Sequence, residues 1–477
     1  MPHTILMVVS EMAPFSKTGG LGDVGAALPS ALARLGHDVT VVTPRYRGVI
    51  GGAEVERFAG GELVGGYATT VLEHREPDGV RIWFVDCPAF FDRAGIYGEA
   101  AGDYPDSAER FGLLSHVALE TAARIGLNPS VVHAHDWQAG LTPAYVKTRY
   151  ASAALGQARV VFTIHNLAYQ GMFEKDIVPV LKLGWETYTS DGLEFWDRVS
   201  FLKAGINYSD AVTTVSRRYA EEIQVPELGC GFDGVLRQRA GVLTGIPNGI
   251  DTVVWDPAAD PWLPAAFSAT DLRGKVEAKH ALLGRFGMQS PAHLARPVIG
   301  MVSRMVDQKG LDLIAAAERE LMALDAAFVV LGTGAPKYEA MWQRLTKERP
   351  HQVAATVGFS EELAHLIEAG ADIFLMPSRF EPCGLNQMYS LRYGTVPVVR
   401  ATGGLDDTVR DADVQAGSGT GFKFGPYTPA AMLEALRAAL KTFRSPQAWR
   451  RIQQAGMRED HSWDKSAREY VTLYDGR

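Results

Sequence analysis

Short apolar runs alternate with amphipathic segments along the chain. The runs Ile5–Val9 and Asp38–Thr43 have the continuous hydrophobicity of buried parallel strands, and residues 23–36 between them have helical spacing, with Asp23 near the N-cap. This pattern predicts a βαβ unit that opens a parallel sheet. Gly48–Gly79 is rich in glycine and alternates weakly, so we expect hairpins or loops there. Further strands are expected at Val80–Val85, Val131–His135, Val160–Ile164 and Ser209–Val215, and helices at 109–125 and 217–222.

The alternation stops and then restarts in the middle of the chain. Residues 247–251 and 256–264 are rich in turn-forming residues and lack periodicity, which is typical of a hinge. A new strand is predicted at Val298–Val302, and a helix at Gly310–Leu324 follows it. The pattern predicts an α/β fold with two doubly wound units, residues 1–248 and 249–455, before a helical segment at 456–477. Ser445–Tyr474 is expected to be helical throughout.

Composition narrows the classes of function. The 477 residues are 47% hydrophobic and 21% charged, with a net charge of −8, so binding to nucleic acid or to an anionic membrane is not expected as the main activity. The three cysteines lie far apart, which indicates a reducing compartment without disulfides. The N-terminal apolar run is too short for a signal peptide, and we therefore expect a cytoplasmic protein.

Ser378–Gln387 lies where a predicted strand, Asp372–Met376, leads into a predicted helix, Gln387–Tyr393. Open α/β sheets bind ligands beyond the carboxyl ends of their strands, and the first N–H groups of the following helix suit a phosphate. Glu381 adds a carboxylate and Cys383 a thiol at the same turn. The alternative is an ordinary βα loop that contains a proline.

A glycine-rich loop follows the first predicted strand. The spacing Gly20-x-Gly22-x-x-Gly25 matches the dinucleotide fingerprint, and Arg45 after the second strand could receive a 2′-phosphate. However, about ten residues separate the strand from the first glycine, whereas the fingerprint follows its strand almost at once. A loop that approaches a diphosphate, with Lys17 as the counter-charge, is the better interpretation; a plain glycine turn is the alternative.

Other polar groups also follow predicted strands. Arg304 and Lys309 lie between a strand and a helix, where two cations can neutralise a leaving diphosphate, although solvated surface charge is the ordinary explanation of such a pair. His135–Trp137 and His165–Asn166 end two strands of the first half and should point toward one crevice. The acidic pair in Asp411-Ala-Asp413 resembles a metal-binding pair of some sugar transferases, but its polar surroundings favour a surface position.

Together these motifs give the chain its resemblance to a known family. It resembles the bacterial glycogen synthases and soluble starch synthases of glycosyltransferase family 5. The matching blocks are Lys17–Leu21, His135–Trp137, Phe162–Gly171, Asn248–Asp251, Ser303–Arg304, Gln308–Gly310, Ser378–Leu385 and Thr402–Leu405. The resemblance implies a GT-B fold: two Rossmann-like domains facing across a cleft, with the C-terminal helix (456–477) crossing back to the first domain.

The resemblance also implies the reaction. Glucose would move from ADP-glucose to the non-reducing end of glycogen or a maltooligosaccharide with retention of the α configuration, without a cofactor or a metal, and closure of the domains would bring Lys17 to the substrate. Alternatives are a UDP-glucose-dependent enzyme of the same architecture and an α-glucan phosphorylase, which needs a pyridoxal lysine. A nicotinamide dehydrogenase and a non-enzymatic sugar-nucleotide sensor also remain open. Oligomeric state is not predicted.

The resemblance assigns roles residue by residue. The implied catalytic residues are Lys17, Asp136, His165, Arg304, Lys309 and Glu381. The implied substrate-binding residues are Gly19, Gly20, Asp23, Tyr97, Trp137, Asn166, Asn248, Phe359, Cys383, Gly384, Leu385 and Asn386. Two positions depart from the family pattern: Asn386 stands where threonine is usual, and Ala401 where proline is usual. Asn386 matters more, because the N–H groups of its turn should face the diphosphate.

Overall fold

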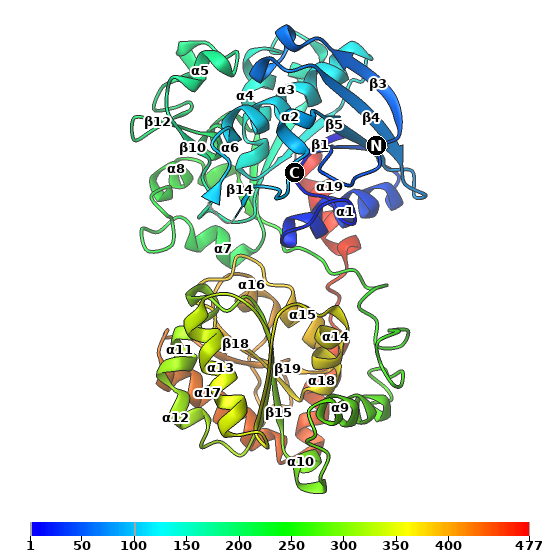
Figure 1. The fold of residues 1–477 in the computed structure, drawn as a ribbon, viewed down its shortest axis with the longest axis vertical. Helices are drawn as coiled ribbons and strands as arrows, with labels where there is room; N and C mark the ends of the chain where they lie inside the picture. The colour runs from blue at the N-terminus through cyan, green and yellow to red at the C-terminus, as the bar shows by residue number, and fades with distance from the viewer. Residues whose placement is uncertain (1, 100–101, 477) are drawn as a thin grey trace. The chain divides into compact units, whose positions relative to one another are not determined.

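A computed structural model describes residues 2–99 and 102–476, which form two compact units (Figure 1). The first unit contains the residues up to Asn248 and those from Trp463 onward. The second contains Gly249–Ser462. Near the C-terminus the chain therefore leaves the second unit and rejoins the first at Trp463. The sequence pattern placed this boundary at residue 456.

A nine-stranded sheet organises the first unit, in the order β14-β13-β9-β8-β1-β2-β5-β4-β3. The strands from β14 to β5 are parallel, and β4 and β3 add an antiparallel hairpin in the predicted glycine-rich segment. The strands are β1 Thr4–Val8, β2 Asp38–Pro44, β3 Ala53–Phe58, β4 Thr69–Arg75, β5 Arg81–Asp86, β8 Val131–His135, β9 Arg159–Ile164, β13 Ala211–Thr214 and β14 Leu243–Gly245. Short pairs are β6 Gly98–Glu99 with β7 Gly102–Asp103, and β10 Met172–Phe173 and β11 Glu194–Phe195 with β12 Arg198–Ser200.

Helices complete the first unit. They are α1 Gly20–Arg34, α2 Pro88–Phe91, α3 Ser107–Arg124, α4 Leu141–Thr148, α5 Ile177–Val180, α6 Phe201–Tyr208, α7 Arg217–Glu222, α8 Asp233–Gln238 and α19 Trp463–Tyr474. The strands β2 to β5 extend the sheet from β1 toward one edge. The chain then returns, and β8, β9, β13 and β14 extend the sheet from β1 toward the opposite edge. The point between β1 and β8 is thus a topological switch point, where open α/β sheets bind ligands.

The C-terminal helix α19 belongs to the first unit, as the resemblance implied. In Figure 1 it lies beside α1, and Trp463 and Tyr470 are buried in the core of this unit. Arg34 of α1 donates to Asp464 of α19 at 2.7 Å. The segment before it is not helical, contrary to the expectation of a continuous helix. The N–H of Ile250 donates to the carbonyl of His461 at 2.8 Å, and this pairing requires extended backbone.

The second unit has a six-stranded parallel sheet in the order β17-β16-β15-β18-β19-β20. Its switch point lies between β15 and β18. The strands are β15 Val298–Val302, β16 Ala327–Gly332, β17 Val353–Val357, β18 Ile373–Met376, β19 Val396–Arg400 and β20 Phe422–Phe424. The helices are α9 Arg273–Arg285, α10 Pro291–Ala295, α11 Leu311–Ala316, α12 Glu318–Leu321, α13 Pro336–Glu348, α14 Glu361–Gly370, α15 Asn386–Arg392, α16 Gly403–Thr408, α17 Pro429–Phe443 and α18 Pro446–Met457.

The core of the second unit has two parts. Buried side chains form two separate hydrophobic clusters: Ile299, Met301 and Phe328 belong to one, and Val298 and Val329 to the other. Neighbouring residues of a strand point to opposite faces of a sheet, so the clusters cover the two faces. This double burial explains the continuous apolar runs of the sequence. Within the described ranges, no helix is both long and apolar enough to cross a membrane.

Candidate active site

The loop after β1 is held by a buried carboxylate that the sequence interpretation missed. Glu11 accepts hydrogen bonds from the backbone N–H of Thr18 and, at 2.8 Å, from its hydroxyl. The Tyr97 hydroxyl donates to the same carboxylate at 2.5 Å and also contacts Ser10 Oγ at 2.9 Å. Glu11 therefore links the glycine loop to the loop carrying Tyr97. Its signal in the sequence was an acidic residue shortly after a buried strand, since only Val9 and Ser10 separate Glu11 from β1.

Lys17 projects from this loop. Its side chain is 52% exposed, and its ammonium group lies 2.6 Å from Asp23 Oδ1. Gly19 is the N-cap of α1 and provides no side-chain acceptor for the first helical amides, and Gly20 is the first helical residue. Gly25 lies on the inner side of the helix, where a Cβ would come within 2.3 Å of the Glu11 carbonyl oxygen. The third glycine of the fingerprint-like spacing is thus required for close packing of α1 against the backbone of Glu11.

The ends of β8 and β9 bring two predicted residues together. The backbone N–H of His165 donates to Asp136 Oδ1 at 2.7 Å, and Asp136 has φ 55°, a conformation uncommon outside glycine. Burial raises the pKa of Asp136 to about 7, against the opposing effect of the N–H groups of His165 and Asn166. Burial also lowers the pKa of His165 to about 3, so this imidazole is neutral at physiological pH. The site at the ends of β8 and β9 therefore combines a carboxyl group, Asp136, whose pKa is close to neutral pH with a neutral imidazole, His165, that can form hydrogen bonds.

Trp137 and two asparagines lie in the same unit. The Trp137 ring packs edge-to-face on Phe111 with centroids 5.1 Å apart, and Gly171 leaves room for it, since a Cβ there would come within 2.6 Å of the ring. Asn166 Oδ1 accepts the N–H of Ala168 at 3.1 Å and thereby shapes its own loop. Asn248 is buried, and its Oδ1 has no partner among the described residues.

In the second unit, Lys309 and Glu381 form a close ion pair. They lie 72 residues apart in the sequence, and the Lys309 ammonium is 2.6 Å from Glu381 Oε2. The Ser378 hydroxyl donates to the same oxygen at 3.0 Å, and Glu381 is only 5% exposed. Arg304 is exposed after β15 and donates to Gln308 Oε1 at 3.2 Å. Two cations and a buried carboxylate therefore follow the two strands that flank the switch point.

Glycines shape the turn around Glu381. Gly384 has φ 71°, and Gly403 has φ 46° and lies so close that a Cβ would come within 1.9 Å of the Glu381 carbonyl oxygen. The next N–H, of Gly404, donates to that carbonyl at 3.0 Å. The α16 turn and the Glu381 turn are thus packed backbone against backbone, which only glycine permits. Cys383 between them is 6% exposed.

Both departures from the family pattern have a structural role. Asn386, the first residue of α15 after Leu385, donates through Nδ2 to the carbonyl of Val302 at 2.7 Å. Its side chain therefore ties α15 to the end of β15. Ala401 donates its backbone N–H to the carbonyl of Phe424 at 2.8 Å, a bond that proline cannot make.

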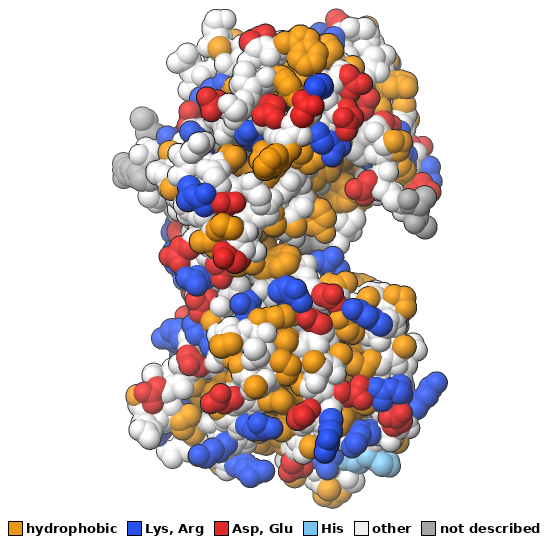
Figure 2. Space-filling view, turned by 90° about the vertical axis from the view of Figure 1, so that its left-hand side faces the viewer, with side chains coloured by type: hydrophobic (Ala, Val, Ile, Leu, Met, Phe, Trp, Pro, Cys, Tyr) orange, Lys and Arg blue, Asp and Glu red, His pale blue; other side chains and the backbone are white. Residues whose placement is uncertain are grey.

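The predicted residue Phe359 does not join a cluster, and neither does the acidic pair Asp411 and Asp413, which lies at the surface as expected. Phe359 is 91% exposed after β17. Asp411 accepts the backbone N–H of Lys423, and Asp413 that of Ala416, each at 2.9 Å, so both acids shape turns. Across residues 2–99 and 102–476, no group of three or more acidic, histidine or cysteine side chains has the geometry of a metal site. Figure 2 shows basic and acidic side chains interspersed on the face in view.

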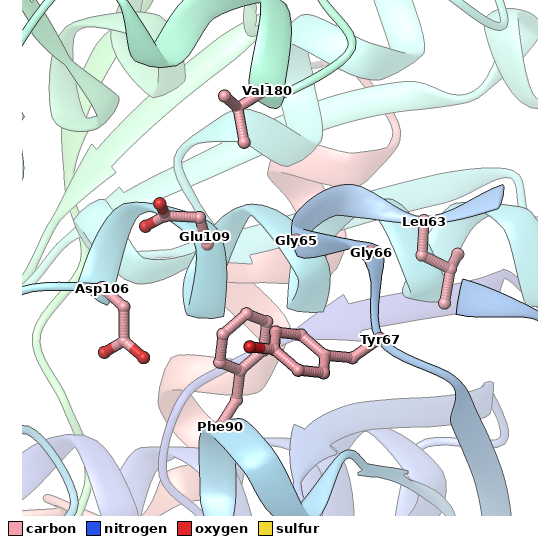
Figure 3. Close-up of a pocket in the computed structure, with 8 residues that line it drawn as sticks. All are labelled: Leu63, Gly65, Gly66, Tyr67, Phe90, Asp106, Glu109 and Val180. Carbon is pink, nitrogen blue, oxygen red and sulfur yellow. The ribbon is translucent and has the colours of Figure 1, made fainter. Parts of the chain in front are cut away.

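A hollow of about 380 Å³ lies elsewhere in the first unit (Figure 3). The rings of Tyr67 and Phe90 meet edge-to-face with centroids 5.0 Å apart, beside the carboxylates of Asp106 and Glu109. Asp106 is already paired with Arg93, whose Nη1 donates to Oδ1 at 2.7 Å. None of the residues that line the hollow is one of the predicted site residues. The chemistry-bearing groups therefore lie at the switch points and not in this hollow.

Two Rossmann-like units, each with polar and cationic groups at its switch point, define a glycosyltransferase of the GT-B class. Residues 4–238 match the family model of the starch synthase catalytic domain, and residues 288–455 that of the glycosyl transferases group 1. The chain is 53% identical to a glycogen synthase of Anaeromyxobacter sp. (strain Fw109-5), with 98% of each chain covered, and 47% identical to that of Koribacter versatilis (strain Ellin345), with 99% and 97% covered. The chain belongs to the family of glycogen synthases and starch synthases and is a transferase.

Solved structures agree with this assignment. The catalytic domain of starch synthase IV from Arabidopsis thaliana, bound to ADP and acarbose, superposes with a TM-score of 0.89 at 35% identity, covering 100% of this chain and 99% of that one. Sucrose-phosphate synthase from Thermosynechococcus elongatus shares the fold at a TM-score of 0.62 and 17% identity, with 99% and 98% covered. The expected fold class and family are confirmed.

Proposed function

We propose that this enzyme transfers glucose from ADP-glucose to the non-reducing end of an α-1,4-glucan, with release of ADP and retention of the α configuration. The observation that carries the proposal is the Lys309–Glu381 pair at the switch point of the second unit, with Arg304 on the same loop after β15 as Lys309. Relatives named glycogen synthase and a similar enzyme bound to ADP and acarbose support the choice of donor and acceptor.

The second unit would bind the donor diphosphate. When the bond between the glucosyl C1 and the phosphate oxygen breaks, its electron pair stays on the phosphate, and negative charge grows on the diphosphate. Lys309 and Arg304 would offset this charge, with the amides of the Gly384–Asn386 turn as donors. Donors and cations placed where charge develops contribute most of the rate enhancement in such sites.

Glu381 would hold sugar hydroxyls and offset the positive charge that develops on the glucosyl ring. Its carboxylate is already oriented by Lys309 and Ser378, so little reorganisation is needed. In the first unit, neutral His165 would hydrogen-bond the glucosyl group. Asp136 and the Trp137 ring would face the acceptor, with Trp137 as a stacking surface.

Bond formation balances without an added reagent. The acceptor O4 forms the new bond to C1 on the face that the phosphate leaves, and the O4 proton passes to the departing phosphate oxygen. Because lysine and arginine side chains neutralise the diphosphate, we propose that the reaction needs neither a metal nor a cofactor. The small number of cysteines supports a location in the reducing cytoplasm.

The experiment is release of ADP from ADP-glucose in the presence of maltooligosaccharide, with UDP-glucose in parallel. Chain elongation is followed by chromatography, and the new anomeric proton is followed by NMR. We expect elongation by α-linked glucose with ADP-glucose as the preferred donor. Binding of ADP-glucose without release of ADP would indicate a sensor. Turnover that requires inorganic phosphate and pyridoxal phosphate would indicate a phosphorylase, and turnover of NAD(P) a dehydrogenase; each result would refute the proposal.

A further inference from the structure

Three histidines lie in a row on β8 and after β9 in the first unit, and of these His133 and His135 are fully buried while His165 is partly buried. His133 and His135 lie on β8, with ring centroids 4.1 Å apart, and His165 follows β9. His135 Nδ1 is 3.0 Å from His165 Nε2, so these two nitrogens share one hydrogen bond. Since burial lowers the pKa of all three histidines, each ring is neutral and carries a single N–H.

His133 cannot serve as a second partner for His135. Its Nδ1 lies 2.8 Å from the hydroxyl of Tyr474 on α19, and its Nε2 lies 2.7 Å from Thr163 Oγ1. Both nitrogens of His133 are therefore occupied. The remaining nitrogen of His135, Nε2, is fully buried and has no partner among the residues that the structure describes.

The shared hydrogen bond allows only two proton arrangements. If His165 Nε2 were the donor, the single N–H of His135 would be on Nε2, a buried donor without an acceptor. If His135 Nδ1 is the donor, Nε2 of His135 is a bare nitrogen that carries no hydrogen. Buried N–H groups without an acceptor are rarer in proteins than under-satisfied acceptors, which favours the second arrangement.

We propose that His135 is a positioning residue that donates from Nδ1 to His165 and thereby holds His165 in the tautomer with its proton on Nδ1. Nε2 of His165 is occupied by this bond, so the group left for a ligand is the Nδ1–H donor. His165 then offers a hydrogen bond to a sugar oxygen and cannot act as a base there. This functional consequence rests on the proposed glucosyl transfer, whereas the tautomer itself does not.

The tautomer is measurable in the full-length protein. Long-range ¹H–¹⁵N spectra of protein labelled with ¹⁵N-histidine distinguish a protonated from a bare ring nitrogen, and the spectrum of His165→Gln assigns the signals of His165. We expect a protonated Nδ1 and a bare Nε2 at His165. This result is not the default, because an isolated neutral imidazole prefers its proton on Nε2. A proton on Nε2, an averaged pair of tautomers or an imidazolium would overturn the proposal.

Two variants then test the role of His135. His135→Asn keeps an amide donor at the place of Nδ1 and should retain the Nδ1–H tautomer of His165, with kcat/KM within about threefold of the wild type. His135→Leu keeps a similar volume but removes the donor, so His165 should lose this tautomer and kcat/KM should fall at least about tenfold, the worth of one lost hydrogen bond. His351→Leu at an exposed position is the control for histidine removal.

The outcomes separate positioning from general damage. Equal losses of activity in both His135 variants, with an unchanged tautomer, would contradict the role of His135. If His135→Leu does not fold, the wild-type spectrum and the His135→Asn comparison still decide the matter. A wild-type protein that shows the expected tautomer but transfers no glucose would leave the positioning intact and refute the proposed function instead.

Discussion

Removal of Lys309 is the sharpest test of the diphosphate site. The Lys309 ammonium is 2.6 Å from Glu381 Oε2, and its side chain keeps 18% of its exposure, so one face is open to a ligand. If this charge stabilises the departing diphosphate, Lys309→Ala should lower kcat by about 10²–10³, or about 2.7–4 kcal/mol. The assay is ADP release at saturating ADP-glucose and maltooligosaccharide.

The same change also leaves a buried carboxylate with fewer partners. Loss of one member of a fully buried ion pair costs about 3–5 kcal/mol of stability, and a smaller loss is expected here because Lys309 is partly exposed and Ser378 still donates to Glu381. Thermal unfolding therefore accompanies the kinetic assay. Lys441→Ala, which removes an exposed lysine near the end of α17, is the matched control and should change neither quantity.

A double-mutant cycle separates direct stabilisation of the diphosphate from mere support of Glu381. If Lys309 only orients the Glu381 carboxylate, Lys309→Ala should lower kcat little when Glu381 is already replaced by Gln. The coupling energy between the two substitutions should then equal the whole loss that Lys309→Ala causes in the wild type. If Lys309 contacts the diphosphate, most of the loss in kcat should persist in that background. An active Lys309→Ala enzyme, or a loss that disappears in the Glu381→Gln background, would refute the assignment.

Three further outcomes are expected. Burial raises the pKa of Asp136 from 3.8 to about 7, so between about pH 4 and 7 the unfolded chain releases this proton while the folded protein retains it. Rising pH therefore favours unfolding over this range, and the melting temperature of the wild type should fall relative to that of Asp136→Asn. Asp260→Ala leaves two buried groups, His365 Nδ1 and the Tyr393 hydroxyl, 2.7 and 2.6 Å from Asp260 Oδ2, without this partner. Urea unfolding should therefore show a loss of about 1–3 kcal/mol for each unsatisfied group, whereas the exposed control Asp325→Asn should not. EDTA should leave turnover unchanged, and loss of activity that a divalent cation restores would contradict a metal-free mechanism.

The strands that flank the sites were predictable because they are buried on both faces. Val131–His135 and Val298–Val302 coincide with β8 and β15, where apolar runs end at polar residues. The start of α1 was not predictable from the sequence. The helix begins at Gly20, ahead of the expected start at Asp23, and glycine is a weak helix former. The expected helix Gly310–Leu324 is interrupted at Ala317, which lies between α11 and α12.

The C-terminal segment shows the limit of periodicity. Residues 445–474 have helical character on both sides of a break, and only the pairing of Ile250 with His461 and Ser462 identifies the extended stretch between α18 and α19. That contact joins residues about two hundred positions apart along the chain. A local pattern cannot contain it, whereas the burial of Trp463 in the first core is consistent with its apolar ring.

The sequence analysis named groups proposed to contact a ligand but missed the supporting carboxylate of Glu11. Lys309 and Glu381 follow two different strands, and the structure places the Lys309 ammonium 2.6 Å from Glu381 Oε2. Glu11 and His135 are buried among hydrogen-bonding partners from distant segments, so their roles follow only from the coordinates. Of these, Glu11 carried the clearer signal, because a carboxylate that is buried shortly after a strand requires compensating donors.

Buried supporting residues can affect the rate of glucosyl transfer because they hold a contacting side chain in one orientation and one tautomer. A group that must donate to a sugar oxygen loses rate if it first has to reorient or change its tautomer, and neighbours that are themselves held remove that cost. His165 has such support from Asp136 on its backbone N–H and from His135 on its ring. His135 in turn packs on His133, which Tyr474 of α19 holds by a hydrogen bond. The C-terminal helix is thus connected through a continuous row of buried rings to a side chain proposed to contact the substrate.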